Sequence, residues 1–127
     1  MAHADVDLIR EVIKEAYIEG VHTTQDAAVI RTGFHQEFLM LVLNDNAVEK
    51  VTVDNWLERV QRLKAANPEL WSARTRCEYR ALEIAGYTAM VELDVYKGDM
   101  HFSTDFMLLY RFADGWKIVS KTFSVPG

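Results

Sequence analysis

The C-terminal half of the chain alternates apolar and polar side chains over three long segments, residues 87–97, 100–112 and 116–125. Two turn signals, Gly98-Asp99 and Asp114-Gly115, separate these segments. Alternation with a period of two predicts strands, and short connections that contain Gly and Asp predict hairpins. The segments therefore predict an antiparallel sheet, whose apolar face the rest of the chain has to cover.

Another alternating segment precedes these three, but its apolar side chains change face part-way. Cys77 and Tyr79 have one parity, whereas Leu82 and Ile84 have the other. A β-bulge near Arg80-Ala81 would explain the change, because a bulge adds one residue to one strand of a pair.

A shorter pair of strands is predicted in the middle of the chain. The apolar run from Phe38 to Leu43 is too short and too uniformly apolar for a surface helix, and Asn44-Asp45-Asn46 after it is typical of a turn. We expect this strand to return through Val48 to Val51.

The remaining segments have helical spacing, and three helices are predicted: Asp5 to Gly20, Thr23 to Gly33, and Thr52 to Asn67-Pro68. Asp and Thr side chains cap helix starts, Gly ends helices, and a residue before proline avoids the helical region. Thr23 and Asp26 form a capping-box-like pair. The apolar stripes comprise Val6, Ile9, Val12, Ile13, Ala16, Tyr17, Trp56, Val60 and Leu63.

Helices followed by strands, with no linker or repeat, predict one α+β domain over residues 1–127. The net charge of −5, without a basic patch, makes nucleic acid an unexpected partner. No run approaches the ~20 apolar residues of a membrane span, so no membrane association is expected. The lone Cys77 and the lack of a signal-peptide start predict a cytoplasmic protein.

Hairpin length sets which residues share a face of the sheet. A loop around Gly98-Asp99 places Tyr96 opposite His101, and continuous pairing from there gives an apolar inner face and a mixed outer face. The predicted inner residues of the second long strand are Phe102, Thr104, Phe106, Leu108 and Tyr110. The predicted outer residues are Glu92, Asp94, His101, Ser103 and Asp105, with Met90, Met107 and Leu109 among them.

The last hairpin allows two interpretations. A three-residue loop, Ala113 to Gly115, turns Trp116, Ile118, Ser120 and Thr122 inward and sets Lys121 near Glu92 and Asp105 outside. A two-residue loop would bury Lys117 and Lys121 beneath the helices, which is costly without partners. We favour the three-residue loop. The mixed outer face then predicts a homodimer through that face, because interfaces combine an apolar centre with a polar rim.

Three runs together resemble the NTF2-like superfamily: Gly33-Phe34-His35-Gln36-Glu37-Phe38-Leu39-Met40-Leu41, Val51-Thr52-Val53-Asp54-Asn55-Trp56, and Asp114-Gly115-Trp116-Lys117-Ile118-Val119-Ser120-Lys121. This superfamily includes SnoaL-like and ketosteroid-isomerase-like proteins, and the chain is most similar to the group named putative lumazine-binding proteins. The resemblance implies a cystatin-like cone, three N-terminal helices on a strongly bent sheet, with a pocket between them and dimers formed through the sheet. Its members include isomerases, dehydratases and cyclases as well as proteins that bind or assemble without catalysis.

No catalytic motif stands out, and no cofactor is expected. The histidines show no paired spacing, so no metal site is expected either. His35 follows the predicted helix end at Gly33, where a loop could aim its imidazole into the cone, or where it could simply fix the turn through backbone hydrogen bonds. Asp105 is the second candidate, since a carboxylate among apolar neighbours suits proton abstraction. Its expected outer position favours a structural ion pair instead.

Aromatic and hydroxyl side chains predict the ligand. Tyr17, Trp56, Tyr110 and Trp116 are expected to approach the inner face, and Thr104 would add a hydroxyl there. Such a pocket favours a small, largely apolar, planar or ring-shaped molecule. A small-molecule binding protein is therefore the leading hypothesis. The alternatives are a proton-transfer enzyme that uses His35 or Asp105, and an assembly module with a filled interior.

Overall fold

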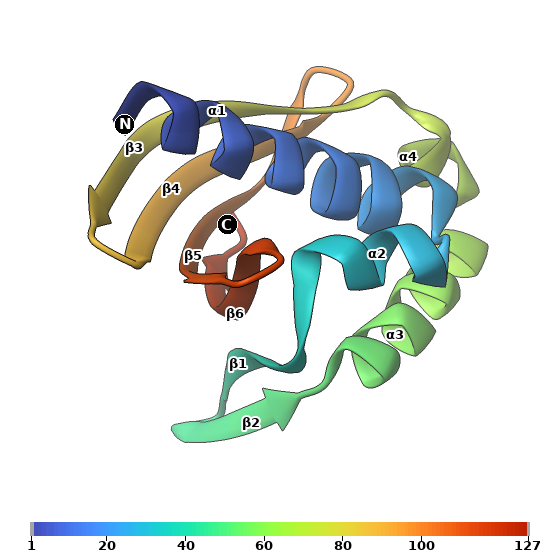
Figure 1. Cartoon of the computed structure of the whole chain (residues 1–127). Coiled ribbons are helices and arrows are strands. Elements are labelled where there is room, and N and C mark those ends of the chain that lie inside the picture. The colour runs from blue at the N-terminus through green and yellow to red at the C-terminus, as the bar shows by residue number, and fades with distance from the viewer. Residues whose placement is uncertain (1, 127) are drawn as a thin grey trace.

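The sheet is the largest element of the computed structural model, which describes residues 2–126, and helices cover its concave side (Figure 1). The helices are α1 (Ala2–Val12), the π-helix η1 (Ile13–Thr24), α2 (Ala27–Gly33), α3 (Val53–Ala66) and α4 (Pro68–Ser72). The strands are β1 (Phe34–Asn44), β2 (Ala47–Val51), β3 (Thr75–Ala85), β4 (Thr88–Lys97), β5 (Met100–Phe112) and β6 (Gly115–Ser124). The predicted α+β class is confirmed.

The six strands lie in the order β2-β1-β6-β5-β4-β3. Every neighbouring pair is antiparallel except β1 and β6, which are parallel. The last strand of the chain therefore lies between the first hairpin and the other long strands. Side chains of β6 that point inward consequently reach the middle of the concave face.

One predicted cap, Thr52, begins its helix as expected, whereas the second helix begins at Asp26 and not at the predicted Thr23, which lies in η1. The Thr52 hydroxyl accepts a hydrogen bond from the backbone N–H of Asn55 at 3.3 Å, and α3 begins there as predicted. Asp26, the second member of the predicted capping pair, is the cap of α2 and accepts from the backbone N–H of Ala28 at 3.0 Å. The short helix α4, which starts at Pro68, was not predicted. Proline suits the first turn of a helix because that position needs no N–H partner.

The first helix does not end at Gly20 as predicted, because α1 continues directly into η1. A π-helix bonds residue i to residue i+5, so side chains five apart lie nearly above one another. Tyr17 and His22 are such a pair, and both are buried. At the end of α2, a Cβ on Gly33 would lie 2.4 Å from the Cβ of Ala16. Glycine is therefore needed for α2 to pack this closely.

Two bulges confirm one prediction and overturn another. The pairing of β3 with β4 skips Arg80, as the change of parity predicts. Tyr96 lies opposite His101 as predicted, but the next pair is Val95 and Ser103, so β5 has an unpredicted bulge at Phe102. The predicted faces of β5 are therefore wrong beyond this point. Residues turned inward are Ser103, Asp105, Met107 and Leu109, and those turned outward are Thr104, Phe106, Leu108 and Tyr110.

The last hairpin has the two-residue loop, since Phe112 pairs with Gly115, so the favoured three-residue loop from Ala113 to Gly115 is wrong. Trp116 and Ile118 are buried as predicted, but the pairing then skips Val119. Lys121 consequently turns inward, whereas Ser120 and Thr122 turn outward. The predicted outer position of Lys121 is wrong because its buried ammonium group has a partner, Asp105, on the same inner face.

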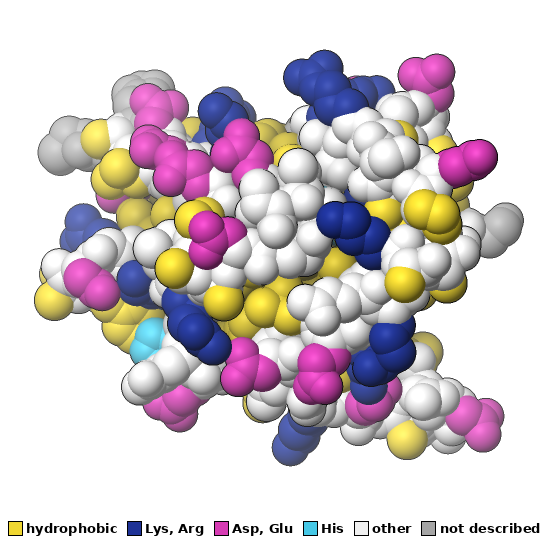
Figure 2. All heavy atoms as spheres, turned by 90° about the vertical axis from the view of Figure 1, so that its right-hand side faces the viewer, with side chains coloured by type: hydrophobic (Ala, Val, Ile, Leu, Met, Phe, Trp, Pro, Cys, Tyr) yellow, Lys and Arg dark blue, Asp and Glu magenta, His cyan; other side chains and the backbone are white. Residues whose placement is uncertain are grey.

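The helical side of the molecule carries an apolar centre within a charged surround. Figure 2 shows this side, the right-hand side of Figure 1, with hydrophobic side chains gathered in a central hollow and side chains of both charge signs around them. Among the described residues, no helix is both long and apolar enough to cross a membrane.

Candidate ligand-binding site

A cavity of about 340 Å³ lies between the helices and the concave face of the sheet. This volume is within the range of small-molecule sites. Its wall is built by η1, α3, α4 and the inward side chains of β1, β5 and β6. The aromatic side chains that line it are Tyr17, Trp56, Trp71, Phe102 and Phe123, and the polar ones are His22, Arg59, Ser103 and Lys121.

The aromatic rings support one another in two groups. The ring centre of Trp56 lies 5.7 Å from that of Tyr17 and 5.8 Å from that of Phe38, on which it stacks. On the other side, Trp71 meets Phe102 edge to face at 5.8 Å. Aromatic pairs at such distances add to the stability gained from burial. The wall of the cavity is therefore rigid and offers flat apolar surfaces.

Asp105 is the centre of a buried polar cluster directly behind this wall. It is fully buried, and its carboxylate accepts hydrogen bonds from the Tyr17 hydroxyl and from the Ser103 hydroxyl, the latter at 2.9 Å. The Nζ of Lys121 lies 3.6 Å from its Oδ1. Burial, and then the charge of Asp105, raise the pKa of Tyr17 well above its ordinary value, so the phenol keeps its proton and remains a donor.

Lys121 contacts both the cluster and the cavity. The residue is 4% exposed, and its Nζ lies 4.4 Å from the ring centre of Phe123 and 5.1 Å from that of Trp56. Burial lowers the pKa of Lys121, while the Asp105 carboxylate acts in the opposite direction. Cation–π contacts and a buried carboxylate together compensate part of the cost of removing this ammonium group from water.

His22 is buried without a hydrogen-bond partner. Both of its ring nitrogens lack one among the described residues, although its ring lines the cavity. Burial, followed by the charges of Lys97 and Lys121, lowers the pKa of His22 well below its ordinary value, so the imidazole is neutral near pH 7. A neutral imidazole has one N–H donor and one acceptor nitrogen, and an unsatisfied buried group costs about 1–3 kcal/mol.

A second lysine lies behind the cavity wall. The Nζ of Lys97 is 3.8 Å from the ring centre of Trp71 and donates a hydrogen bond to the Thr75 hydroxyl at 3.0 Å. Burial, and then the charge of Lys64, lower the pKa of Lys97 to about 8. This end of the cavity therefore lies near positive charge as well.

Two of the predicted ligand-binding residues, Tyr17 and Trp56, line this cavity. Thr104 and Tyr110 do not, because the bulge at Phe102 turns them to the outer face, where Tyr110 is 52% exposed and Thr104 bonds to Asp94. For Asp105 the expected outer position is wrong, because the same bulge turns it to the inner face, where it lies beneath the cavity.

His35 lies outside the aromatic cavity, in a surface hollow between the start of β1 and the start of α3. Its ring stacks on Phe112 at 4.6 Å, and its Nδ1 accepts a hydrogen bond from the backbone N–H of Glu37 at 3.1 Å. The backbone-fixing interpretation of His35 fits this position. The ring does not point into the cone as the catalytic hypothesis requires.

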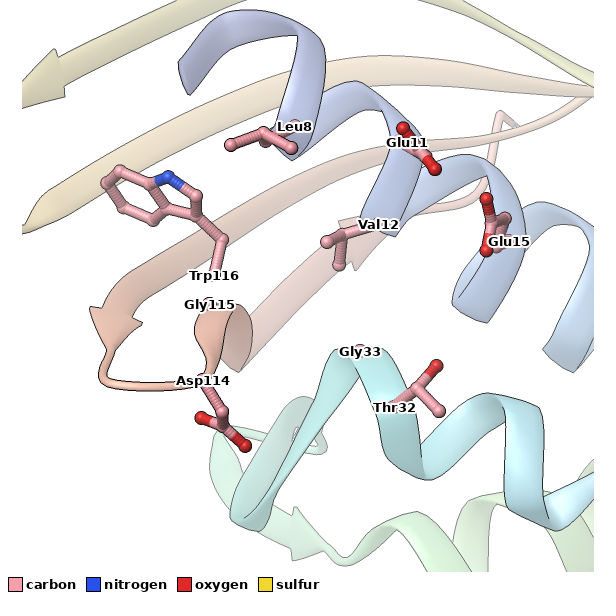
Figure 3. Close-up of a pocket in the computed structure, with 9 residues that line it drawn as sticks. All are labelled: Leu8, Glu11, Val12, Glu15, Thr32, Gly33, Asp114, Gly115 and Trp116. Atoms are coloured by element: carbon pink, nitrogen blue, oxygen red, sulfur yellow. The ribbon is translucent and has the colours of Figure 1, made fainter. Parts of the chain in front are cut away.

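Trp116 lines a different, smaller hollow of about 250 Å³ between α1, the end of α2 and the β5–β6 hairpin (Figure 3). Its indole N–H donates to the carboxylate of Asp5 at 3.1 Å. Three acidic side chains, Glu11, Glu15 and Asp114, border the same hollow. A hydrogen bond that the protonated Glu15 carboxyl shares with Glu11, followed by slight desolvation, raises the pKa of Glu15. The tryptophan predicted to bind ligand therefore packs against α1 instead.

Sequence reasoning missed His22, Trp71 and Lys121. His22 lies beyond the glycine at which the helix is predicted to end, and only the apolar Val21 after that glycine indicates that the helix goes on. Trp71 is on the unpredicted helix α4. Among the side chains that the structure describes, those of residues 4–126, no three His, Cys, Asp or Glu group as metal ligands would.

Comparison with known proteins places the chain in a family. The family model described as "Putative lumazine-binding" matches residues 4–124. The chain belongs to this family. The resemblance drawn from the sequence is thereby confirmed. No curated protein matches the chain.

Solved structures similar to this family member have NTF2-like or cystatin-like folds. An NTF2-like protein of unknown function from Shewanella baltica OS155 is 20% identical, with a TM-score of 0.80 over 100% of this chain and 98% of that one. Another from Silicibacter pomeroyi DSS-3 is 15% identical, with a TM-score of 0.79 over 99% of both chains. A domain of unknown function with a cystatin-like fold from Nostoc punctiforme is 13% identical, with a TM-score of 0.66 over 98% of this chain and 78% of that one. These similarities establish the fold.

Proposed function

We propose that the protein binds a small, flat, ring-bearing molecule in the cavity between its helices and concave sheet. The observation that carries this proposal is the aromatic lining, since five rings surround a space of about 340 Å³ and few polar groups interrupt them. Pockets of this kind bind drug-sized apolar molecules and use isolated polar groups to orient them. The family's name gives a pterin-like ring system a natural place among the compounds to test.

A thermal-shift screen tests the proposal with pterins, flavins, steroids and aromatic acids. A ligand that binds only the folded state raises the melting temperature. At a ligand concentration of one hundred times Kd, it adds about 2.7 kcal/mol to the free energy of unfolding. The Val60→Phe variant fills the cavity from α3 and should abolish the shift. Leu8→Phe is the matched control, because it fills the separate hollow beside α1. Absence of any shift, or an equal shift in the Val60→Phe variant, contradicts the proposal.

A second candidate function, a proton-transfer enzyme, is favoured by the inward position of Asp105. Tyr17 and Lys121 contact this carboxylate and also line the cavity, so a substrate there would lie one side chain away from it. His35 is outside the cavity, which leaves Asp105 as the base of this hypothesis. An Asp105→Asn variant that folds and keeps full turnover on a substrate found by the screen would contradict it.

We also propose that the outer face of the sheet forms a homodimer. Phe106, Leu108 and Tyr110 are about half exposed on that face, which is more apolar surface than a solvated sheet needs. Leu108→Asp should convert a dimer into a monomer in sedimentation, and Leu43→Asp, on the β1–β2 hairpin, should not. A 14.6 kDa monomer of the unaltered protein at micromolar concentration contradicts the proposal.

The free thiol of Cys77 supports a cytoplasmic location.

A further inference from the structure

His22 has hydrogen-bonding capacity that none of the described residues uses. Neither ring nitrogen has a partner among the described residues. Trp71 stacks on the ring at 5.5 Å, while Tyr17 at 4.8 Å and Phe102 at 5.7 Å contact it edge to face. These three rings hold the imidazole in one orientation. A polar group of an occupant that reaches this ring would therefore meet one of its nitrogens in a fixed position.

Lys121 offers positive charge to the same space. Its ammonium group has three donors, yet the described acceptors near it are the Asp105 carboxylate, in a long ion pair, and the sulfur of Met40 at 3.8 Å. Asp105 already accepts hydrogen bonds from Tyr17 and Ser103, so its charge is shared among three groups. Donor capacity of Lys121 thus remains, and it lies beside the rings of Trp56 and Phe123 that line the cavity.

The charge around the cavity is unbalanced. No carboxylate belongs to the described residues that line it, whereas Lys121 and Arg59 do. Arg59 pairs with Glu49, and Lys121 with Asp105. Lys97, against the ring of Trp71, has no ion pair among residues 2–126. One positive charge therefore stays uncompensated near an apolar space, where charges interact strongly.

We propose, on the basis of the binding function above, that the ligand is a planar organic anion. Its anionic oxygen lies at the Nζ of Lys121, its ring system lies among Trp56, Trp71 and Phe102, and a polar group on its edge forms a hydrogen bond with one ring nitrogen of His22. Such a ligand gives one ring nitrogen of His22 a partner and offsets the surplus positive charge. A neutral molecule of the same shape would form the hydrogen bond with His22 but would leave the positive charge uncompensated.

A matched pair of compounds separates charge from shape. The probes are 2-naphthoate, a flat monoanion, and 2-naphthamide, its neutral counterpart, titrated at pH 7 by isothermal calorimetry. The naphthoate should bind about tenfold more tightly or better, because charge-assisted hydrogen bonds are about twice as strong as neutral ones.

Variants of Lys121 test where the anion lies. Lys121→Met combined with Asp105→Asn removes both charges of the buried pair, so neither is left alone, and should weaken naphthoate binding about tenfold while changing naphthamide binding less than about threefold. Lys117→Met is the matched control on the same strand, since its Nζ donates instead to the Thr32 carbonyl at 3.0 Å. Lys121→Arg keeps the charge and should preserve the preference for the anion.

His22→Phe keeps a flat ring in the stack and removes both nitrogens, and it should weaken both compounds. His101→Phe, on the outer face, is its control and should weaken neither. Equal affinity of the two compounds, or naphthoate affinity unchanged by the charge-removing variant, overturns the anion proposal and leaves the binding function standing. The same holds if neither naphthyl compound binds while a neutral member of the wider screen does. Failure of every compound in the screen contradicts both proposals.

Discussion

Two aspartates lie on opposite faces of the same sheet, and each has hydroxyl and basic side chains as neighbours. Asp105 on the inner face accepts hydrogen bonds from two hydroxyl groups and pairs with Lys121. Asp94 on the outer face accepts from the Thr104 hydroxyl at 2.6 Å and lies 3.2 Å from His101 and 3.6 Å from Arg80. The inner cluster is almost wholly shielded from water, whereas in the outer cluster the side chains of Asp94, His101 and Arg80 are 14%, 34% and 54% exposed.

The difference between the two clusters is the solvent. Water weakens the interaction between charges and can replace a lost partner, so an exposed ion pair contributes little to stability. A buried charge that loses its partner has no replacement. The same residue types therefore stabilise the fold on the inner face, whereas on the outer face they contribute little to its stability.

The largest expected effect is the loss of the inner carboxylate. Asp105→Ala leaves the ammonium group of Lys121 buried and unpaired, and it should lower the free energy of unfolding by about 3–5 kcal/mol. Urea denaturation followed by circular dichroism measures this change. Replacing the pair together, by Asp105→Asn with Lys121→Met, should recover part of the loss. A loss below about 1 kcal/mol for Asp105→Ala would mean that the inner cluster behaves like a surface pair.

An intermediate effect is expected on acidification, because the two faces also differ in their histidines. The folded state holds His22 neutral, whereas the unfolded chain takes up a proton near the ordinary pKa of 6.5. The unfolded state then binds more protons, so the free energy of unfolding falls as the pH drops below about 6.5, by up to about 1.4 kcal/mol per pH unit. Above that pH this contribution to stability is fully present.

Urea denaturation at pH 7.5, 6.5 and 5.5 follows this dependence. His22→Phe removes the titrating group and should flatten the slope, whereas His101→Phe, whose ring contacts Asp94, keeps His22 and should not. An unchanged slope in the His22→Phe variant would show that other groups cause the acid sensitivity.

The smallest effect is expected for the outer carboxylate. The Thr104 hydrogen bond, and then the charge of Arg80, lower the pKa of Asp94, so the carboxylate is ionised at neutral pH. Asp94→Ala should nevertheless cost about 0.5–1 kcal/mol at most, and less at high salt, because screening weakens exposed pairs. Denaturation in 0.05 M and 1 M sodium chloride measures both values. A loss as large as that of Asp105→Ala would remove the distinction between the two faces.

Much of the fold could be predicted because local signals were strong. Thr52, Asn67-Pro68 and Gly98-Asp99 end or begin elements through their own backbone preferences. The bulge at Arg80 was visible because the apolar side chains of β3 change parity there. Those of β5 do not: both parities contain apolar residues, so the bulge at Phe102 left no trace in the pattern.

The site was harder to predict for the same reason. Asp105 and Lys121 were placed together correctly, but on the wrong face, since the cost of burying each was judged without the other. Tyr17 and Trp56 follow the α-helical period and were found. His22 follows the wider period of a π-helix, which propensity does not indicate, and its position depends on tertiary packing.

The bulges at Phe102 and Val119 also bear on how relatives of this protein should be aligned. A bulge absorbs one extra residue without changing the faces on either side of it. A homologue that lacks Phe102 would still place the counterparts of Ser103 and Asp105 opposite Val95 and Leu93. A deletion between Asp105 and Leu109, by contrast, would turn the inward-facing residues outward, and the outward-facing residues inward, in the rest of the strand. In a sequence alignment, gaps placed at the two bulges therefore keep equivalent cavity residues aligned. Gaps placed elsewhere in β5 or β6 would align residues that face opposite sides of the sheet.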